Sequence, residues 1–241
     1  MQAATIYGDI HGNYPALAAV LGEMESRGLT DQYCLGDLVG YGVQPNEVVA
    51  EIRARKVPTL MGNYDLGVGN DSDDCGCAYK TEVEEARGKQ SIAWTNAHAS
   101  ADHKTFLRNL PASIPLQLGD LAVLLVHGSP RRVNEYLYES RPDESFERVL
   151  DGVGVDVLVC GHTHLPYHKV LPSGRHVINA GSVGKPKDGD PRAGFIVLSA
   201  TGRELTVEFA RVPYDVEAAA RAIEATNMPH EFAAMLREAR G

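Results

Sequence analysis

Several features are scarce or missing in this sequence of 241 residues. No apolar run approaches the ~20 consecutive residues that a membrane-spanning helix needs, so we expect no membrane partner. Positive charge is also in short supply, since 23 Lys and Arg face 32 Asp and Glu, for a formal net charge of −9. This balance argues against a partner such as long nucleic acid, which requires a basic surface. A strand-like run begins at Ala3 and leaves no room for a signal peptide, so we expect a cytoplasmic protein.

Cysteine is rare as well, with four residues in the chain. Cys34 and Cys160 lie within apolar runs and are interpreted as small buried hydrophobic residues. Cys75 and Cys77 flank a glycine in an acidic loop. For these two, a metal or redox role and an ordinary loop of a reducing compartment both stay open.

Five short polar motifs each follow an apolar run that we predict to be a strand. The runs are Ala3–Tyr7, Gln32–Leu35, Val57–Met61, Leu121–Val126 and Val155–Cys160. The motifs are Asp9-Ile10-His11-Gly12-Asn13, Gly36-Asp37, Gly62-Asn63, His127-Gly128 and Gly161-His162-Thr163-His164. The carboxyl ends of strands are where α/β sheets bind their ligands. Residues two apart on an extended chain point the same way, so we expect Asp9/His11 and His162/His164 each to direct two side chains at one place.

The motif side chains combine carboxylate and amide oxygens with imidazole nitrogens. This mixture suits Mn, Fe, Zn or similar divalent ions, and the lack of cysteine in the motifs argues against a structural zinc site. The candidate ligands are Asp9, His11, Asp37, Asn63, His127, His162 and His164. Seven ligands serve two four-coordinate sites when one of them, Asp37, is shared by both metals.

As a set, these motifs resemble those of calcineurin-like metallophosphoesterases, which read Asp-Xaa-His, Gly-Asp, Gly-Asn-His-Asp/Glu, a lone His and Gly-His-Xaa-His. The resemblance covers roughly residues 3–198 and is strongest to the small bacterial phosphodiesterase branch. It implies an α/β fold of two stacked mixed β-sheets flanked by helices, a four-layer α/β/β/α sandwich. It further implies the division of the ligands between the metals: Asp9, His11, Asp37 and His164 for one, and Asp37, Asn63, His127 and His162 for the other.

The resemblance also implies the chemistry. We expect a phosphoester hydrolase, preferably a phosphodiesterase, in which a hydroxide between two divalent metals attacks a small phosphodiester. Manganese is the favoured metal, with Fe, Zn, Ni and Co as alternatives. A phosphomonoesterase or a nucleotide or protein phosphatase on the same metals stays open, as does a non-catalytic metal-binding scaffold. The sequence leaves the physiological substrate and the oligomeric state open.

Two departures from the family pattern bear on this function. Gly40 and Tyr41 stand where protein phosphatases of the superfamily have Asp and Arg, which weakens the protein-phosphatase alternative. Tyr64 replaces the motif histidine that protonates the leaving group, while Asp65 is retained. Tyr64 and Asp65 are the predicted catalytic residues, although a tyrosine with a reference pKa of ~10 is a weak acid at neutral pH.

Polar residues beside the motifs are candidates for substrate binding. We predict this role for Asn13, Arg131 and Ser182, since Arg is well suited to bidentate phosphate contact. Lys185 and Lys187, which follow the Gly-Ser turn, are further candidates for neutralising phosphate oxygens.

The chain is interpreted as one domain, residues 1–241, because it shows no internal repeat or low-complexity linker. Strand and helix signals alternate, and Pro15 and Pro45 begin two helices. Residues 66–118 interrupt this alternation with an acidic loop and then helical sequence from about residue 81 to residue 109. We predict that this stretch is an insertion that caps the site, with a peripheral helical pair as the alternative.

Overall fold

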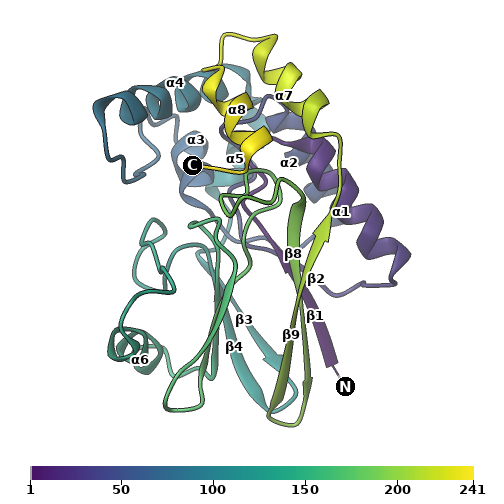
Figure 1. The fold of residues 1–241 in the computed structure, drawn as a ribbon, viewed down its shortest axis with the longest axis vertical. Coiled ribbons are helices and arrows are strands. Elements are labelled where there is room, and N and C mark those ends of the chain that lie inside the picture. The colour runs from purple at the N-terminus through teal and green to yellow at the C-terminus, as the bar shows by residue number, and fades with distance from the viewer. Residues whose placement is uncertain (1) are drawn as a thin grey trace.

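Two β-sheets form the centre of the computed structural model, which describes residues 2–241 (Figure 1). Sheet A, in the order β2-β1-β8-β9, consists of β1 (Gln2–Tyr7), β2 (Gln32–Cys34), β8 (Ala193–Thr201) and β9 (Glu204–Val212). Sheet B, in the order β3-β4-β5-β7-β6, consists of β3 (Ser113–Leu118), β4 (Leu121–Val126), β5 (Val157–Cys160), β6 (Tyr167–Val170) and β7 (His176–Asn179). Both sheets are mixed: β1 is parallel to β2 and antiparallel to β8, while β4 is antiparallel to β3 and parallel to β5.

The sheets pack face to face because one face of each is apolar. Ile6 and Ile196 of sheet A share a buried cluster with Val123 and Val159 of sheet B. Three helices cover the outer faces: α1 (Tyr14–Ser26) and α2 (Pro45–Arg55) on sheet A, and α6 (Asp143–Asp151) on sheet B (Figure 1). The prediction of two mixed sheets flanked by helices is therefore confirmed.

Apolar periodicity explains how the outer helices bind the sheets. In α6, Phe146, Val149 and Leu150 are three and four residues apart, so they share the face that packs on sheet B. Helix α1 begins directly after Asn13, whose side-chain oxygen accepts a hydrogen bond from the amide of Ala16 and caps the helix. The first motif thus ends where the first helix begins.

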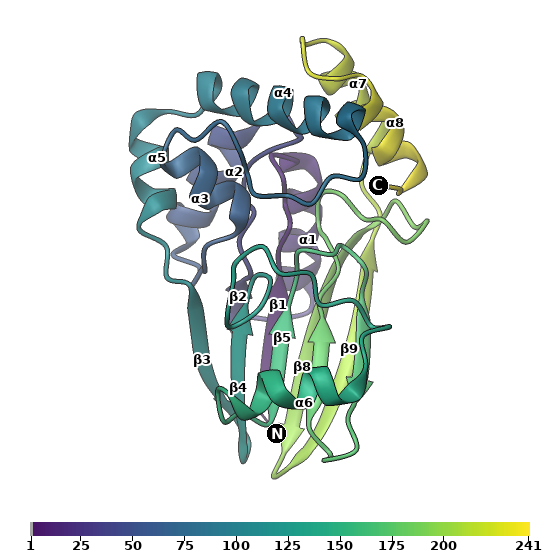
Figure 2. The same cartoon turned by 90° about the vertical axis from the view of Figure 1, so that its left-hand side faces the viewer.

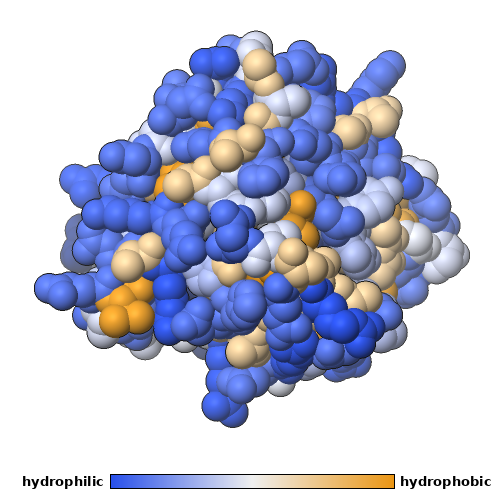
Figure 3. All heavy atoms as spheres, turned by 90° about the horizontal axis from the view of Figure 1, so that it is seen from above, coloured by the Kyte–Doolittle hydropathy of each residue, from blue (hydrophilic) through white to orange (hydrophobic). Residues whose placement is uncertain are grey.

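Four further helices gather at one end of the two sheets (Figure 2). They are α4 (Glu82–His98), α5 (Ala101–Arg108), α7 (Val216–Glu224) and α8 (Glu231–Glu238). Trp94 of α4 packs with Ile223 of α7 and Phe232 of α8 in one apolar cluster. Seen from above, this end of the molecule presents polar residues interspersed with small apolar areas (Figure 3). Within residues 2–241, none of the helices has the length and apolar character that crossing a membrane requires.

Three local predictions need correction. Val57–Met61 is not a strand, because Pro58 has no N–H to donate, and only an isolated parallel bridge joins Thr59 to Cys34. The third motif instead runs into a short helix that the sequence did not suggest, α3 (Asn63–Gly69). The predicted insertion is shorter than residues 66–118, since Ser113–Leu118 form β3 at the edge of sheet B.

Candidate metal centre

The side chains of the five motifs converge, and all seven predicted ligands are buried with at most 3% exposure. Six of them form two groups, and the potential ligand atoms of each group lie within 4.8 Å of one another. We name these group 1, consisting of Asp9, His11 and His164, and group 2, consisting of Asp37, His127 and His162. This is the division that the family resemblance implied. Asn63 adjoins group 2, with its Oδ1 atom 3.0 Å from Nε2 of His127.

Asp37 lies between the two groups. Its Oδ2 atom is 3.3 Å from Nε2 of His127 in group 2 and 3.6 Å from Nε2 of His11 in group 1. Its other oxygen, Oδ1, accepts a 2.8 Å hydrogen bond from the backbone amide of Tyr64. One carboxylate is therefore held in place by the backbone and faces both groups, as a shared ligand requires.

Backbone carbonyls orient three of the four histidines. In each ring the Nδ1 atom pairs with a carbonyl oxygen: His11 with Val39 at 3.0 Å, His127 with Leu35 at 2.8 Å and His164 with Lys185 at 2.6 Å. A carbonyl only accepts, so Nδ1 carries the proton and the Nε2 lone pair of a neutral ring points into the site. This is the arrangement that metal-binding histidines commonly adopt.

Several atoms in the centre lack a hydrogen-bonding partner within residues 2–241. Oδ1 of Asp9 and Nε2 of His162 are buried and unpaired, and the Nε2 atoms of His11 and His164 face each other at 3.1 Å. Buried lone pairs left in this way are costly unless a cation satisfies them. Oxygen and imidazole donors in two adjacent groups therefore fit divalent ions such as Mn, Fe, Zn, Ni or Co.

Burial and charge set the protonation of the histidines. Burial lowers the pKa of His11 to about 3, which keeps its ring neutral and able to bind a metal. Burial also lowers the pKa of His127, but the carboxylate of Asp37 outweighs this effect and raises that pKa to about 10. In the metal-free protein a proton on His127 thus offsets part of the charge of Asp37.

Five candidate ligands adopt positive φ angles, which are uncommon for residues other than glycine. The angles are 51° for Asp9 and His11, 52° for Asp37, 64° for His162 and 61° for His164. The prediction that the pairs lie on extended chain is therefore wrong, and tight turns aim these side chains instead. Asp9 and His11 nevertheless share group 1, whereas His162 and His164 point into different groups. Strained backbone of this kind concentrates at functional sites.

Two glycines let the ligand loops approach one another. A Cβ atom on Gly62 would lie 2.1 Å from Oδ1 of Asp37, and one on Gly161 would lie 2.5 Å from Oδ2 of Asp9. Both distances are too short for any side chain. The glycines in the motifs thus reflect close contact between the loops that carry the carboxylates.

Comparison with known proteins agrees with this centre. Residues 1–203 match the calcineurin-like phosphoesterase superfamily domain. The chain belongs to this superfamily. It is 32% identical over 241 residues to the uncharacterized protein MJ0912 of Methanocaldococcus jannaschii, covering 93% of each chain.

Solved structures give the same picture of this calcineurin-like phosphoesterase. A metallophosphoesterase from Sphaerobacter thermophilus is 28% identical and superposes with a TM-score of 0.77 over 99% of each chain. The hypothetical protein PH1004 from Pyrococcus horikoshii OT3 shares the fold, with a TM-score of 0.83 over 98% of each chain at 24% identity. Superfamily membership makes the protein a phosphoester hydrolase by family and its two Asp/His groups candidate sites for divalent metals.

The two predicted catalytic residues of this phosphoesterase lie in the first turn of α3. Tyr64 is fully buried, its hydroxyl has no partner within residues 2–241, and its ring packs 5.5 Å from the ring of His11. The carboxylate of Asp65 accepts hydrogen bonds from the backbone amides of Asp37, Leu38 and Gly62 at 2.7, 2.9 and 3.0 Å. These contacts give Asp65 a positioning role, and a direct catalytic role for either residue stays a prediction.

The three predicted substrate-binding residues are engaged by the protein itself. Asn13 donates to the carbonyl of Gly184 and to the hydroxyl of Tyr214, in addition to capping α1. Ser182 donates to the carbonyl of Asp9 at 2.8 Å and accepts from the amide of Lys185 at 2.8 Å. Both side chains therefore stabilise the loops around the centre.

Arg131 lies on the surface rather than over the metal groups. Its side chain is 54% exposed and forms an ion pair with Glu135, which also accepts hydrogen bonds from Ser129 and Arg141. The sequence-based prediction was that Arg131 contacts phosphate. Glu135, four residues later in the sequence, was the signal that Arg131 forms an ion pair within the protein.

A cleft of about 350 Å³ adjoins the metal centre. Thr163, between the two ligand histidines, lines it, as does Tyr136, whose ring lies 4.0 Å from the ring of His162. The predicted insertion supplies another wall, which includes Cys77 and Lys80. The predicted insertion therefore borders the cleft, and its role as a cap stays a prediction. The sequence did not single out Tyr136 or Tyr138, although their spacing of two residues was the signal that both rings could share one side.

The Cys75-Gly76-Cys77 segment also touches the centre. The side-chain nitrogen of Asn63 donates to the carbonyl of Cys75 at 2.9 Å and to Sγ of Cys77 at 3.3 Å. These two acceptors turn the amide so that its oxygen faces His127. The segment therefore orients a candidate ligand, a role that sequence reasoning missed.

Proposed function

We propose that this protein is a dinuclear metal-dependent phosphodiesterase that hydrolyses a small phosphodiester. The observation that carries the proposal is the position of Asp37, whose Oδ2 atom faces His127 in group 2 and His11 in group 1. A shared carboxylate is what allows two adjacent groups to hold two ions rather than one. Group 1 with Asp37 would hold one ion, and group 2 with Asn63 the other.

Two divalent ions at these ligands would lower the pKa of a bound water and offset the charge of the phosphoryl group. The protein's own residues prepare that chemistry. Backbone carbonyls fix the histidine rings, Asp65 fixes the loop that carries Asp37, and Cys77 orients Asn63. Ligands fixed in this way need little rearrangement during the reaction.

The preference for diesters comes from the family resemblance, and a preference for acidic leaving groups rests on Tyr64. Its buried hydroxyl does not line the cleft, and burial raises its pKa well above the usual value of 10. A group so placed protonates a leaving oxygen poorly, so esters with acidic leaving groups should react best. A phosphomonoesterase on the same groups remains the second candidate, since both reactions use the same ligands.

The charge of the molecule supports a small substrate as its partner. A net charge of −9 repels long nucleic acid, while the local excess of cations in the cleft suits a small anion. Manganese is the metal we propose, and the cytoplasm is the location we propose.

Manganese-loaded protein tests the proposal with bis-p-nitrophenyl phosphate and p-nitrophenyl phosphate. We expect release of p-nitrophenol from both, with the diester preferred, and two metal ions per chain by elemental analysis. Asp37→Asn and His127→Ala should reduce kcat by roughly 10³-fold or more while circular dichroism stays unchanged, because metal-centred charge stabilisation is lost. His168→Ala, a histidine outside the centre, is the matched control. At most one ion per chain, or full activity in Asp37→Asn, would refute the dinuclear centre.

A further inference from the structure

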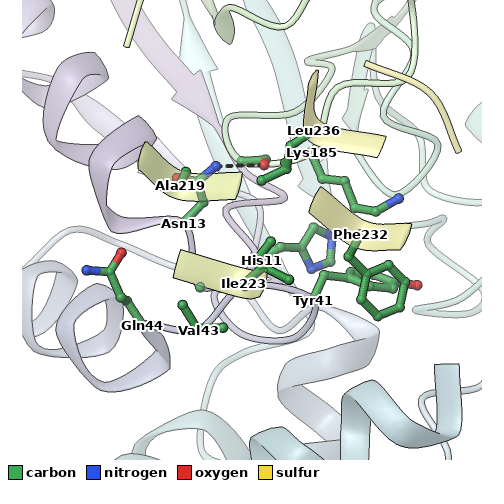
Figure 4. Close-up of a pocket in the computed structure, with 13 residues that line it drawn as sticks. His11, Asn13, Tyr41, Val43, Gln44, Lys185, Ala219, Ile223, Phe232 and Leu236 are labelled. Carbon is green, nitrogen blue, oxygen red and sulfur yellow. Dashed lines mark hydrogen bonds between the residues drawn. The ribbon is translucent and has the colours of Figure 1, made fainter. Parts of the chain in front are cut away.

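Lys185 is a buried cation without an acidic partner. The residue is only 4% exposed, yet within residues 2–241 no carboxylate lies within ion-pair distance of its ammonium group. Its Nζ atom lies 4.8 Å from the centre of the Tyr41 ring. Figure 4 shows the side chain extending past His11 toward Phe232. An ammonium group buried in this way is stabilised when a negative group accompanies it, so the unpartnered Nζ atom suits an anion.

A second lysine follows two residues later. Lys187 is partly buried, lines the same cleft as Lys185, and likewise has no carboxylate partner among the described residues. Two like charges placed together repel each other unless an anion lies between them. The pair therefore has the electrostatic character of an anion site.

The loop that carries the two lysines is tied to the candidate metal ligands. The carbonyl of Lys185 pairs with Nδ1 of His164 at 2.6 Å, and its amide donates to Ser182, which in turn donates to the carbonyl of Asp9. The loop that carries the lysines is thus hydrogen-bonded to two members of group 1, directly to His164 and through Ser182 to Asp9. A site built in this way has a fixed distance to the metal centre.

The composition of the cleft fits the same interpretation. Four basic side chains and one acidic side chain line it together with Gly241, although acids outnumber bases in the whole chain. The cations are Lys80, Arg87, Lys185 and Lys187, and the acid is Glu84. Arg87 is paired with Glu231, which leaves the lysines as the unpaired charges. At about 350 Å³, the cleft has room for more than the one phosphoryl group that reacts.

We propose that Lys185 and Lys187 form an anion subsite for a second phosphoryl group of the substrate, distinct from the phosphoryl group held at groups 1 and 2. The preferred substrate is then a phosphoester that carries a further phosphate. This inference rests on the proposed function, because it names the substrate class of that hydrolase. Two divalent ions at groups 1 and 2 would offset the charge of a simple diester, so a further phosphate is the group that the lysines would neutralise.

Two substrates that differ by one phosphate test the subsite. They are thymidine 5′-(p-nitrophenyl phosphate) and the same ester with a 3′-phosphate, both of which release p-nitrophenol. We expect manganese-loaded protein to favour the 3′-phosphorylated ester in kcat/KM by roughly tenfold or more, as charge-assisted hydrogen bonds commonly provide. Lys185→Met and Lys187→Met should each reduce that ratio, and the double variant should bring it close to one. Lys89→Met, an exposed lysine of α4 paired with Glu85, should leave it unchanged.

A binding measurement on metal-free protein separates this inference from the proposed function. Inorganic pyrophosphate should bind the metal-free wild-type chain in calorimetry, and the double variant should lose that binding. If neither ester is hydrolysed but pyrophosphate binding depends on the lysines, the proposed hydrolase fails and the subsite stands. Three results would each overturn the subsite. The first is equal kcat/KM for the two esters in the wild type, and the second is an equal loss of kcat/KM on both esters in the variants. The third is pyrophosphate binding that survives in the double variant. Lys187 is partly exposed, so Lys187→Met tests the site even if Lys185→Met misfolds.

Discussion

The backbone amide of Asp37 donates a 2.7 Å hydrogen bond to Oδ2 of Asp65, so the carboxylate of Asp65 holds the backbone of Asp37 in place. The amides of Leu38 and Gly62 donate to the same carboxylate. Three backbone donors satisfy its ionised form, while burial and the charge of Asp37 raise the pKa of this carboxyl to about 7. This contact fixes the loops that carry Asp37 and Asn63 relative to each other.

Asp65→Asn should therefore weaken both metal binding and folding. The new NH₂ group would face an N–H donor, which we expect to lower the free energy of unfolding by about 1–3 kcal/mol. Because Asp65 holds the loop that carries Asp37, the substitution should also reduce metal affinity by roughly 10–100-fold. Urea denaturation and metal titration measure the two effects. Asp73→Asn, in the exposed acidic loop, is the control. Unchanged metal affinity in Asp65→Asn would show that this contact does not position the ligands.

Metal removal should destabilise the protein. The centre holds buried carboxylates, unpaired lone pairs and strained turns, which bound cations would stabilise. Manganese at 100 times its Kd contributes about 2.7 kcal/mol, which corresponds to a rise in Tm of roughly 5–10 °C for a chain of this size. Thermal unfolding with manganese and with a chelator measures the shift. The double variant Asp37→Asn/His127→Ala should show a much smaller rise in Tm with manganese. A wild-type Tm that does not change on addition of manganese would contradict the metal centre.

Tyr64 should determine the range of leaving groups. Tyr64→Phe removes a hydroxyl that has no partner within residues 2–241, so rates on p-nitrophenyl esters should hardly change. Tyr64→His restores the family's proton donor and should raise rates on alkyl esters by up to ~10²–10⁴-fold. Steady-state kinetics on both ester types is the measurement. Equal gains on p-nitrophenyl and alkyl esters in Tyr64→His would show that this position does not supply the proton.

Glu135 should make stability depend on acid pH. Burial opposes its ionisation, but hydrogen bonds from Arg131, Ser129 and Arg141 outweigh burial and lower its pKa from 4.5 to about 2. A depressed carboxyl pKa contributes stability that is present above the unfolded value and lost as the pH falls from 4.5 through 2. Glu135→Gln should cost about 1–2 kcal/mol at pH 6 after allowance for solvent screening.

Urea denaturation over a pH series checks this expectation. The difference in unfolding free energy between wild type and Glu135→Gln should shrink steadily below pH 4.5. Arg131→Ala should lower stability at pH 6 and progressively less below pH 4.5, because it removes one of the donors to the ionised carboxylate. A difference that stays constant down to pH 2.5 would mean that the ionised state of Glu135 contributes nothing.

The resemblance of the motifs to a known family was sufficient to predict the two mixed sheets, and the motifs named the candidate ligands that the structure brings together in groups 1 and 2. Alternating apolar runs specify strands whichever neighbour they pair with, and local patterns such as Gly161-His162-Thr163-His164 lie within a few residues of chain. The sequence-based predictions failed where a residue interacts with a partner far away in the sequence, or where a single residue alters the local backbone conformation. Pro58 removed a predicted strand, and positive φ angles replaced the extended geometry expected around Asp9 and His11.

The roles of individual polar residues depended on tertiary structure. Arg131 and Lys185 are both basic residues beside motifs in the sequence. In the structure, Arg131 forms an ion pair with Glu135 on the surface, whereas Lys185 is buried in the cleft with no acidic partner among residues 2–241. Whether a side chain is free to bind substrate depends on what the rest of the chain places within about 4 Å of it, a short-range electrostatic condition that only the folded protein determines.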